Sequence, residues 1–183
     1  MTPLVAGLLE PPGGNRSDLW VVDGTLIPVE DHTMTECSRN YRRSVNVQFV
    51  FRARDRRVIA VGDAWTGNRN DIIAFRATMA EQVAGHRLTT GDGAYRSAPE
   101  VTTSKTKSKP FAKRRARAEH GIARLKDYRV LRQHRRRGDT INSTTRAVSV
   151  RTTSRSTARN YGTPLSPSGP RPVPGLRAGS PVA

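Results

Sequence analysis

The feature that most constrains the fold of this chain is the apolar run LWVVDGTLIPV at residues 19–29. Such a run must be buried, yet Asp23 and Gly24 stand at its centre. Asp-Gly between two apolar segments is a strong signal for a hairpin turn, because both central residues of that turn take positive φ values. An acid at the lip of a buried strand is alternatively a metal ligand on a rigid support. The run alone leaves both interpretations open.

Several segments predict strands. Residues 18–23 and 25–29 are expected to be extended on either side of the Asp-Gly pair. Residues 44–53, SVNVQFVFRA, alternate apolar and polar side chains with a period of two, which indicates a half-buried strand. The turn DRR leads from there into a second strand, VIAVGDAW at 58–65, and a fourth short strand follows in HRLTTGDGAY at 86–95.

Helices are predicted in two places. Residues 68–85 form one, with its N-cap at Asn70 or Asp71 and its end at Gly85. A longer helix at 111–133 carries an apolar stripe at three- and four-residue steps. Strands, a helix, a strand and a closing helix predict an α/β domain with a mixed sheet flanked by helices.

The charge of the chain points to a polyanionic partner. Lys and Arg number 32 against 15 Asp and Glu, which gives a net charge of +17 and a pI near 11.5. Such a balance favours nucleic acid as the partner. Fourteen of these cations lie in residues 105–137, against two acids.

The cysteine count and the hydropathy predict the compartment. Cys37 is the only cysteine, which excludes an intramolecular disulfide and a cysteine-based zinc site within one chain. No apolar run approaches the length that spans a bilayer. We therefore expect a cytoplasmic protein that does not enter membranes.

Composition divides the chain into three segments. Residues 1–17 are expected to be a flexible lead-in, and residues 18–142 the folded domain. Residues 143–183 hold six prolines, six arginines and no acid, and their apolar residues follow no period. We predict that this Arg/Ser/Pro-rich tail is disordered.

Three carboxylates form a candidate metal site. Asp23 and Asp92 each end a strand run and precede a glycine, and Glu119 lies in the basic helix. Two acids on strand ends and a third on a helix can converge on Mg²⁺ or Mn²⁺, the ions that assist phosphodiester chemistry. Taken singly, Asp92 also fits a turn, and Glu119 also fits a solvated partner for Arg115 or Arg124.

Five segments in order resemble a known family: VVDGTLIPV, YRRSVNVQFVF, GNRNDIIAF, TGDGAYRSAPEV and RARAEHGIARLKDYRVL. Together, over about residues 18–141, they resemble the catalytic domain of bacterial insertion-sequence transposases of the DDE superfamily, in the branch shared with Harbinger-like endonucleases. The resemblance implies a ribonuclease H-like fold. It also implies that Asp23, Asp92 and Glu119 bind Mg²⁺ or Mn²⁺ and catalyse cleavage at transposon ends and strand transfer. It thus favours the metal interpretation of Asp23 over the turn.

The resemblance also bears on neighbouring residues. Tyr95 matches the segment of the second aspartate, and Lys126 matches the helix of the glutamate. Lys126 is expected either to hold a DNA phosphate or to lie on the surface with its stem buried. Asp71 is most simply a helix cap, and the resemblance implies a supporting role for it outside the triad. His120 is expected to be a DNA contact or an exposed side chain. The residues expected to bind the DNA backbone are Lys113, Arg114, Arg115, Arg117, Arg124, Lys126 and Arg129.

The chain also departs from the family pattern. Few residues precede the first aspartate, the spacer of 26 residues between Asp92 and Glu119 is short, and the composition changes at Ser143. These departures predict a truncated copy. The main alternative is therefore a catalytically inactive remnant that acts only as a basic DNA-binding protein, and a third is a basic RNA-associated protein. A bacterial, nucleoid-associated location is expected, and a homodimer is left open.

Overall fold

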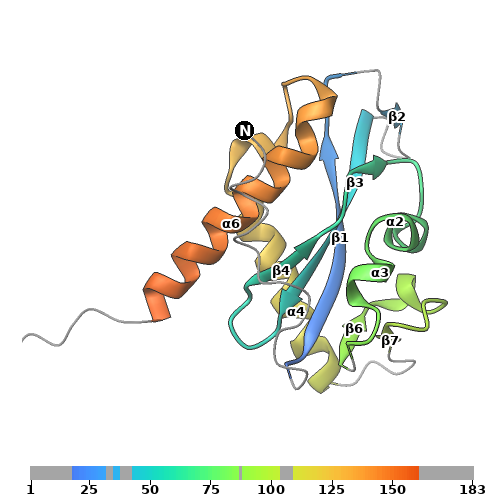
Figure 1. Ribbon diagram of the computed structural model, residues 1–183, viewed down its shortest axis with the longest axis vertical. Helices are drawn as coiled ribbons and strands as arrows, with labels where there is room; N and C mark the ends of the chain where they lie inside the picture. The colour runs from blue at the N-terminus through green and yellow to red at the C-terminus, as the bar shows by residue number, and fades with distance from the viewer. Residues whose placement is uncertain (1–17, 32–34, 38–42, 87, 104–108, 161–183) are drawn as a thin grey trace, which may run out of the picture.

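The computed structural model describes residues 18–31, 35–37, 43–86, 88–103 and 109–160. The predicted lead-in at 1–17 lies outside these residues. Within them the chain forms a mixed sheet with helices on both faces (Figure 1), as the sequence predicts. None of the helices in these ranges combines the length and the hydropathy that crossing a membrane requires.

The sheet has seven strands in the described ranges, in the order β2-β3-β1-β6-β7, with β4 and β5 also paired to β3. Strand β1 runs antiparallel to β3 and parallel to β6, and β6 runs parallel to β7. The long strands β1 and β3 form the centre, and β6 brings the Gly-Asp-Gly segment next to β1. The strands are β1 Trp20–Pro28, β2 Glu36–Cys37, β3 Arg43–Arg52, β4 Val58–Val61, β5 Trp65–Thr66, β6 Thr89–Gly91 and β7 Thr102–Thr103.

Both predicted helices are interrupted in the structure. The first divides at Met79 into two short helices, and the second ends at Lys126 before a further helical turn. The α-helices are α2 Asp71–Thr78, α3 Ala80–Val83, α4 Lys109–Lys126, α5 Arg129–Arg132 and α6 Ile141–Asn160, and the 3-10 helices are η1 Gly93–Tyr95 and η2 Gly138–Thr140.

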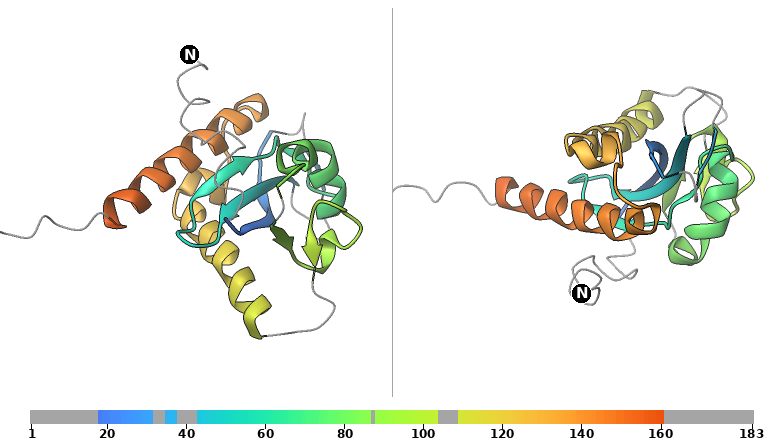
Figure 2. Two further views of the ribbon diagram at one scale, coloured as in Figure 1. Left: turned by 60° about the horizontal axis from the view of Figure 1, so that its bottom comes forward. Right: turned by 90° about the horizontal axis from the view of Figure 1, so that it is seen from above.

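Each face of the sheet has its own core. Helices α2 and α3 cover one face, which we call the α2 face, and α4 covers the other, the α4 face (Figures 1 and 2). On β3, Phe49 and Phe51 pack with Leu125 of α4, whereas Val50 packs with Phe75 of α2. Strand β3 is therefore buried on both faces, and the prediction of a half-buried strand was wrong.

The distance between α4 and the sheet depends on Gly121. A Cβ atom at this position would overlap the ring of Phe51. Because glycine lacks this atom, the helix axis lies close to the sheet, which brings the remaining side chains of α4 near β1.

Helix α6 corrects the prediction of a tail that is disordered from residue 143. Residues 141–160 are helical, and α6 packs along β4 before it projects past the domain (Figures 1 and 2). Its buried face includes Thr145 and Ser149, whose hydroxyls donate to Asn142 O at 2.9 Å and Thr145 O at 2.8 Å. These bonds satisfy the hydroxyls inside the helix, so polar residues can be buried. Residues 161–183 lie outside the described ranges.

Candidate active site

Asp23 lies within a continuous strand. Strand β1 passes through Asp23 and Gly24 without turning, and these residues pair in register with Phe49 and Gln48 of β3. The alternative of a hairpin turn at Asp-Gly was therefore wrong. Glycine is needed at position 24 for a steric reason. A Cβ atom there would lie 2.5 Å from both Asp71 Oδ1 and Gln48 Nε2.

The alternation of β1 directs Asp23 to the α4 face. Val21 and Ile27 belong to the core on that face, whereas Trp20 and Val22 belong to the core on the α2 face. Because successive side chains of a strand point to opposite faces, Asp23 shares the face of Val21 and Ile27.

Asp92 lies beside Asp23. Strand β6 pairs with β1 in parallel at Trp20↔Thr89 and Val21↔Thr90. The same register, continued past Gly91, sets Asp92 level with Asp23 and on the same face. Asp92 is extended, with φ −80° and ψ −173°, and its carboxylate accepts from the N–H of Ala94 at 2.8 Å as the N-cap of η1.

The negative charge of Asp92 acts on the buried carboxylate of Asp23. Burial, then the charge of Asp92 and, to a lesser extent, that of Asp71 together raise the pKa of Asp23 to about 6. Arg115 and a backbone hydrogen bond from Gly24 act in the opposite direction. Adjacent carboxylates that raise a pKa in this way favour a bound cation.

One side of α4 faces the aspartates. Arg115 lowers the pKa of Asp23, and the charge of Asp23 opposes the fall that burial causes in the pKa of Lys126. Arg115, Glu119 and Lys126 are spaced by four and seven residues, so they lie on one side of the helix. Glu119 thus lies between two residues that interact with Asp23.

The carboxylate of Glu119 nevertheless pairs with Arg115. Glu119 Oε1 lies 3.3 Å from Arg115 Nη2, and the Glu119 side chain is 58% exposed. Within the described part of the chain, no group of three or more His, Cys, Asp and Glu side chains lies close enough to hold a metal ion. The structure brings Asp23 and Asp92 together, and it leaves Glu119 on the neighbouring helix.

Asp71 does not cap its helix. The N-cap of α2 is Asn70, which makes no side-chain capping bond. Asp71 Oδ1 instead accepts from Asn46 Nδ2 at 2.8 Å and from Gln48 Nε2 at 3.4 Å. Tyr95 joins this group by donating its hydroxyl to Gln48 Oε1 at 2.5 Å.

Sequence reasoning missed Asn46 and Gln48. Their alternation with apolar residues assigned them to a solvated face, but they are 2% and 0% exposed. The signal that could have revealed their burial is the helix predicted after β3. A helix between two strands of a mixed sheet often covers one face of that sheet, and α2 covers the polar positions of β3.

The predicted DNA-binding residues lie on α4, except for Arg129 on α5. Lys113, Arg114, Arg115 and Arg129 are exposed, as is His120. The remaining members, Arg117, Arg124 and Lys126, are half-buried, and Arg117 donates to the carbonyl of Arg54 at 3.3 Å.

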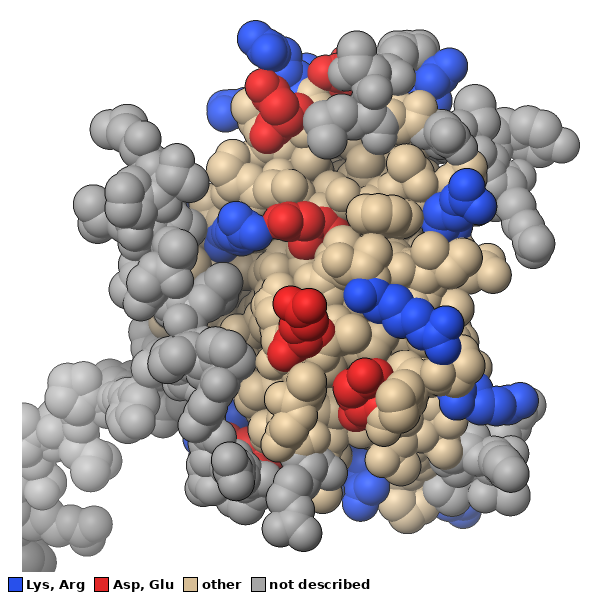
Figure 3. All heavy atoms as spheres, turned by 45° about the vertical axis from the view of Figure 1, so that its right-hand side comes forward, with Lys and Arg blue, Asp and Glu red and all other residues tan. Residues whose placement is uncertain are grey.

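On the opposite side of the domain, over α2 and α3, acidic and basic side chains both occur (Figure 3).

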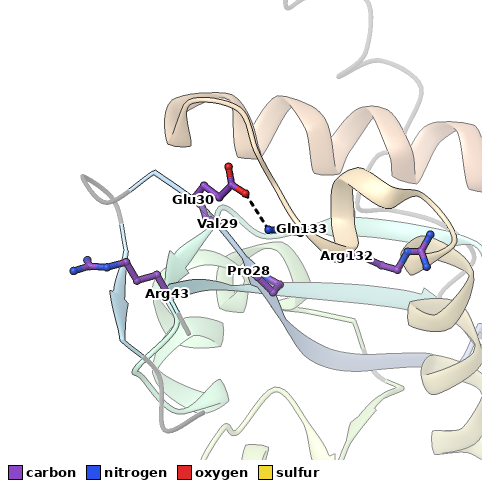
Figure 4. A pocket seen from close by; sticks show the side chains of 6 residues that line it. All are labelled: Pro28, Val29, Glu30, Arg43, Arg132 and Gln133. Atoms are coloured by element: carbon purple, nitrogen blue, oxygen red, sulfur yellow. Dashed lines mark hydrogen bonds between the residues drawn. The ribbon is translucent and has the colours of Figure 1, made fainter. Parts of the chain in front are cut away.

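A separate hollow lies at the carboxyl end of β1 (Figure 4). Glu30 accepts there from Gln133 Nε2 at 3.0 Å and pairs with Arg135 at 3.4 Å. Its lining residues are Pro28, Val29, Glu30, Arg43, Arg132 and Gln133. None of them is a predicted site residue, so this hollow is distinct from the site at Asp23.

A family model matches the segment that contains the two aspartates. Residues 15–105 match the family model described as the transposase DDE domain. This range contains Asp23 and Asp92 and ends before α4.

A curated relative extends the match. The chain is 38% identical to a protein of Streptomyces albus G that is named as a transposase for insertion sequence element IS112. The alignment is 140 residues long and covers 69% of this chain. The chain spans about half the length of this relative, since the match covers 55% of it. No solved structure matches the chain. Over the strands that carry Asp23 and Asp92, the chain is therefore similar to the DDE domain of insertion-sequence transposases.

Proposed function

We propose that this protein is a metal-dependent DNA endonuclease and strand-transfer enzyme of the transposase type, with Asp23, Asp92 and Glu119 as its catalytic carboxylates. The observation that carries the proposal is the nearness of Asp23 and Asp92, on β1 and just after the neighbouring β6, on the side of the sheet that the basic helix α4 covers. The match of residues 15–105 to the transposase DDE domain supports it independently.

The strand order supports a ribonuclease H-like fold. Strand β3 pairs antiparallel with β4 on one side and with β1 on the other, and β6 and β7 then continue in parallel. This arrangement of three antiparallel strands followed by two parallel ones puts the two aspartates on neighbouring central strands. The Harbinger-like branch stays a prediction, because the matching family model is described only as the transposase DDE domain.

The donor set fits Mg²⁺ or Mn²⁺. Asp23 and Asp92 supply hard oxygen atoms close together, and the charge of Asp92 disfavours the ionised form of Asp23 unless a cation is present. Such an ion, when bound, activates a water molecule and stabilises the charge on a phosphodiester. Glu119 is the third ligand that the facing side of α4 offers, and its carboxylate would have to exchange Arg115 for the ion.

The residues of α4 are suited to hold DNA next to these carboxylates. Lys126 is half-buried and close enough to Asp23 for their charges to interact, so its ammonium group can neutralise a phosphate at the site. The exposed cations Lys113, Arg114 and Arg129 extend this binding along the backbone. These contacts orient the strand, and they read no base sequence.

A nicking assay tests the proposal. DNA that carries candidate transposon ends is incubated with wild type or Asp92→Asn in Mg²⁺, Mn²⁺ or Ca²⁺. We expect cleavage by wild type in Mg²⁺ and Mn²⁺, and a loss of at least about 100-fold in the variant, because a lost ligand removes ion binding and water activation together. DNA binding by Asp92→Asn should be retained.

The second candidate function is a basic DNA-binding protein without catalysis. It is favoured by the pairing of Glu119 with Arg115 and by the lack of a cluster of three ligands among the described residues. If wild type and Asp92→Asn bind DNA with the same salt dependence and neither cuts it, this second function holds.

A further inference from the structure

A buried polar network lies directly behind the two aspartates, on the α2 face. Gln48 is at its centre: Nε2 donates to Asn46 Oδ1 at 2.9 Å and to Asp71 Oδ1 at 3.4 Å, and Oε1 accepts from the Tyr95 hydroxyl at 2.5 Å. Asn46 also donates to Asp71 Oδ1 at 2.8 Å. We call Asn46, Gln48, Asp71 and Tyr95 the polar network.

The network crosses β1 beneath Gly24. Gln48 is the partner of Gly24 in the β1–β3 register, yet it bonds to Tyr95, which lies beyond β1 in η1. The side chain can cross because Gly24 has no Cβ atom, which would lie 2.5 Å from Gln48 Nε2. The glycine next to Asp23 thus makes room for the network.

A second glycine, Gly91, makes room for the network next to Asp92. Gly91 precedes Asp92, and a Cβ atom there would lie 2.8 Å from Tyr95 Cδ2. The Tyr95 ring fills this space and meets Phe75 edge-on, with ring centroids 5.5 Å apart. Members of one network therefore fill the space that a side chain at Gly24 or at Gly91 would take.

The hydrogen bonds connect β3 to the segment that begins at Asp92. Tyr95 closes the turn of η1, where its N–H donates to Asp92 O and the Ala94 N–H donates to Asp92 Oδ1. A bond from Tyr95 to Gln48 therefore fixes η1 to β3, and so fixes the main chain of Asp92 relative to β1. Tyr95 and Gln48 are buried, at 1% and 0% exposure, and Asp71 is half-buried, so water does not compete for the bond between Tyr95 and Gln48.

We infer that the polar network is a positioning device, which holds the carboxylates of Asp23 and Asp92 at the spacing that an ion requires. Tyr95, Gln48, Asn46 and Asp71 are positioning residues, because they bond to one another on the α2 face, whereas Asp23 points to the α4 face. Outer hydrogen bonds of this kind set the geometry of metal ligands in many proteins. The inference rests on the proposed function only for the identity of the ion.

The test compares Tyr95→Phe with Ile59→Val. The first variant removes one hydroxyl and keeps the ring that fills the space behind Gly91. The second removes a methyl group from the same core and removes no hydrogen-bonding group. Amide hydrogen exchange is measured first in protein without metal, and Mn²⁺ affinity is then measured by titration.

We expect exchange at Ala94 and Tyr95 to be at least about 10-fold faster in Tyr95→Phe than in wild type, while the amides of β1 and β3 keep their protection. Mn²⁺ should bind about 10-fold more weakly to Tyr95→Phe, as for other outer-shell changes, and within about twofold of wild type to Ile59→Val. Asp71→Ala should reproduce the effect of Tyr95→Phe, and Asp71→Asn, which keeps an acceptor oxygen, should restore most of the protection.

The inference is overturned if the η1 amides exchange at the wild-type rate in Tyr95→Phe, or if Ile59→Val changes them equally. A wild-type protein that binds no Mn²⁺ would instead contradict the proposed function, and the exchange rates of η1 would still decide the role of the network.

Discussion

The polar groups on the two faces of the central sheet differ in their burial and in their bonding partners. On the α2 face, Asn46, Gln48 and Tyr95 are buried, and they bond to one another and to the half-buried Asp71. On the α4 face, Asp23 lies beside Asp92 with a raised pKa, and Glu119 is exposed and paired with Arg115. In the proposed function, the α2 face maintains the geometry of the site and the α4 face supplies the charges that bind an ion or a phosphate.

A substitution at Gly24 should disrupt the hydrogen bonds of the polar network, and we expect it to have the largest effect on stability. Gly24→Ala introduces a Cβ atom that overlaps Asp71 Oδ1 and Gln48 Nε2. Because the network must separate to admit it, we expect the free energy of unfolding to fall by about 3 kcal/mol, from overpacking together with lost buried hydrogen bonds. Urea denaturation measures this change.

Gly93→Ala is the matched control for that prediction. A Cβ atom at Gly93 would meet only Arg96 Nη2, at 3.9 Å, so the stability should change by less than about 0.5 kcal/mol. Equal losses at Gly24 and Gly93 would contradict the view that the network fills the space at Gly24.

Ionisation of Asp23, on the α4 face, should destabilise the folded protein as the pH rises. The pKa of Asp23 is about 6 in the folded protein against 3.8 ordinarily, so the folded state binds this proton more tightly than the unfolded state. The stability from this group is present below about pH 4 and is lost as the pH rises through 6. Allowing for partial exposure, the loss is about 2 kcal/mol.

Asp23→Asn isolates this effect. The variant should be more stable than wild type at pH 7 by about 2 kcal/mol and should approach wild type near pH 4. The difference between their unfolding free energies across this range is the quantity to measure. A difference that does not vary with pH would show that Asp23 is not the group responsible.

The sequence predicted the elements that have a local periodic signal. The run at 19–29, the alternation in β3 and the Gly-Asp-Gly segment predicted strands; β1 carries Asp23, and β6 leads directly into Asp92. Burial of Asn46 and Gln48 was not predicted, because alternation does not distinguish water from a polar network on the other face. Whether Asp23-Gly24 turned or continued likewise depended on β3, which supplies the bonding partners on that edge.

Two other features were not predicted from the sequence. Helix α6 has no periodic apolar stripe, and its Thr145 and Ser149 are buried because their hydroxyls bond to carbonyls of the same helix. The spacing of α4 put Glu119 on the side that faces Asp23, but the choice between Arg115 and the aspartates depends on its side-chain conformation.

The smallest effect on stability is expected at that ion pair. Arg115→Ala removes a salt bridge whose partners are 44% and 58% exposed, so the free energy of unfolding should change by less than about 0.5 kcal/mol. The variant should bind Mn²⁺ at least as tightly as wild type, because Glu119 is released and a nearby positive charge is gone. Weaker binding would indicate that Arg115 orients Glu119 for the ion.

Titration of Mn²⁺ into the protein tests the central claim most directly, that Asp23 and Asp92 form one metal site with Glu119 as its third ligand. Asp63→Asn is the matched control, since it removes the same charge from an acid that pairs with Arg146 on α6. We expect Asp92→Asn to weaken Mn²⁺ binding by about 100-fold and Glu119→Gln by about 10-fold, and Asp63→Asn to leave it unchanged. Equal affinities for wild type and Asp92→Asn, or an equal loss in Asp63→Asn, would contradict the claim.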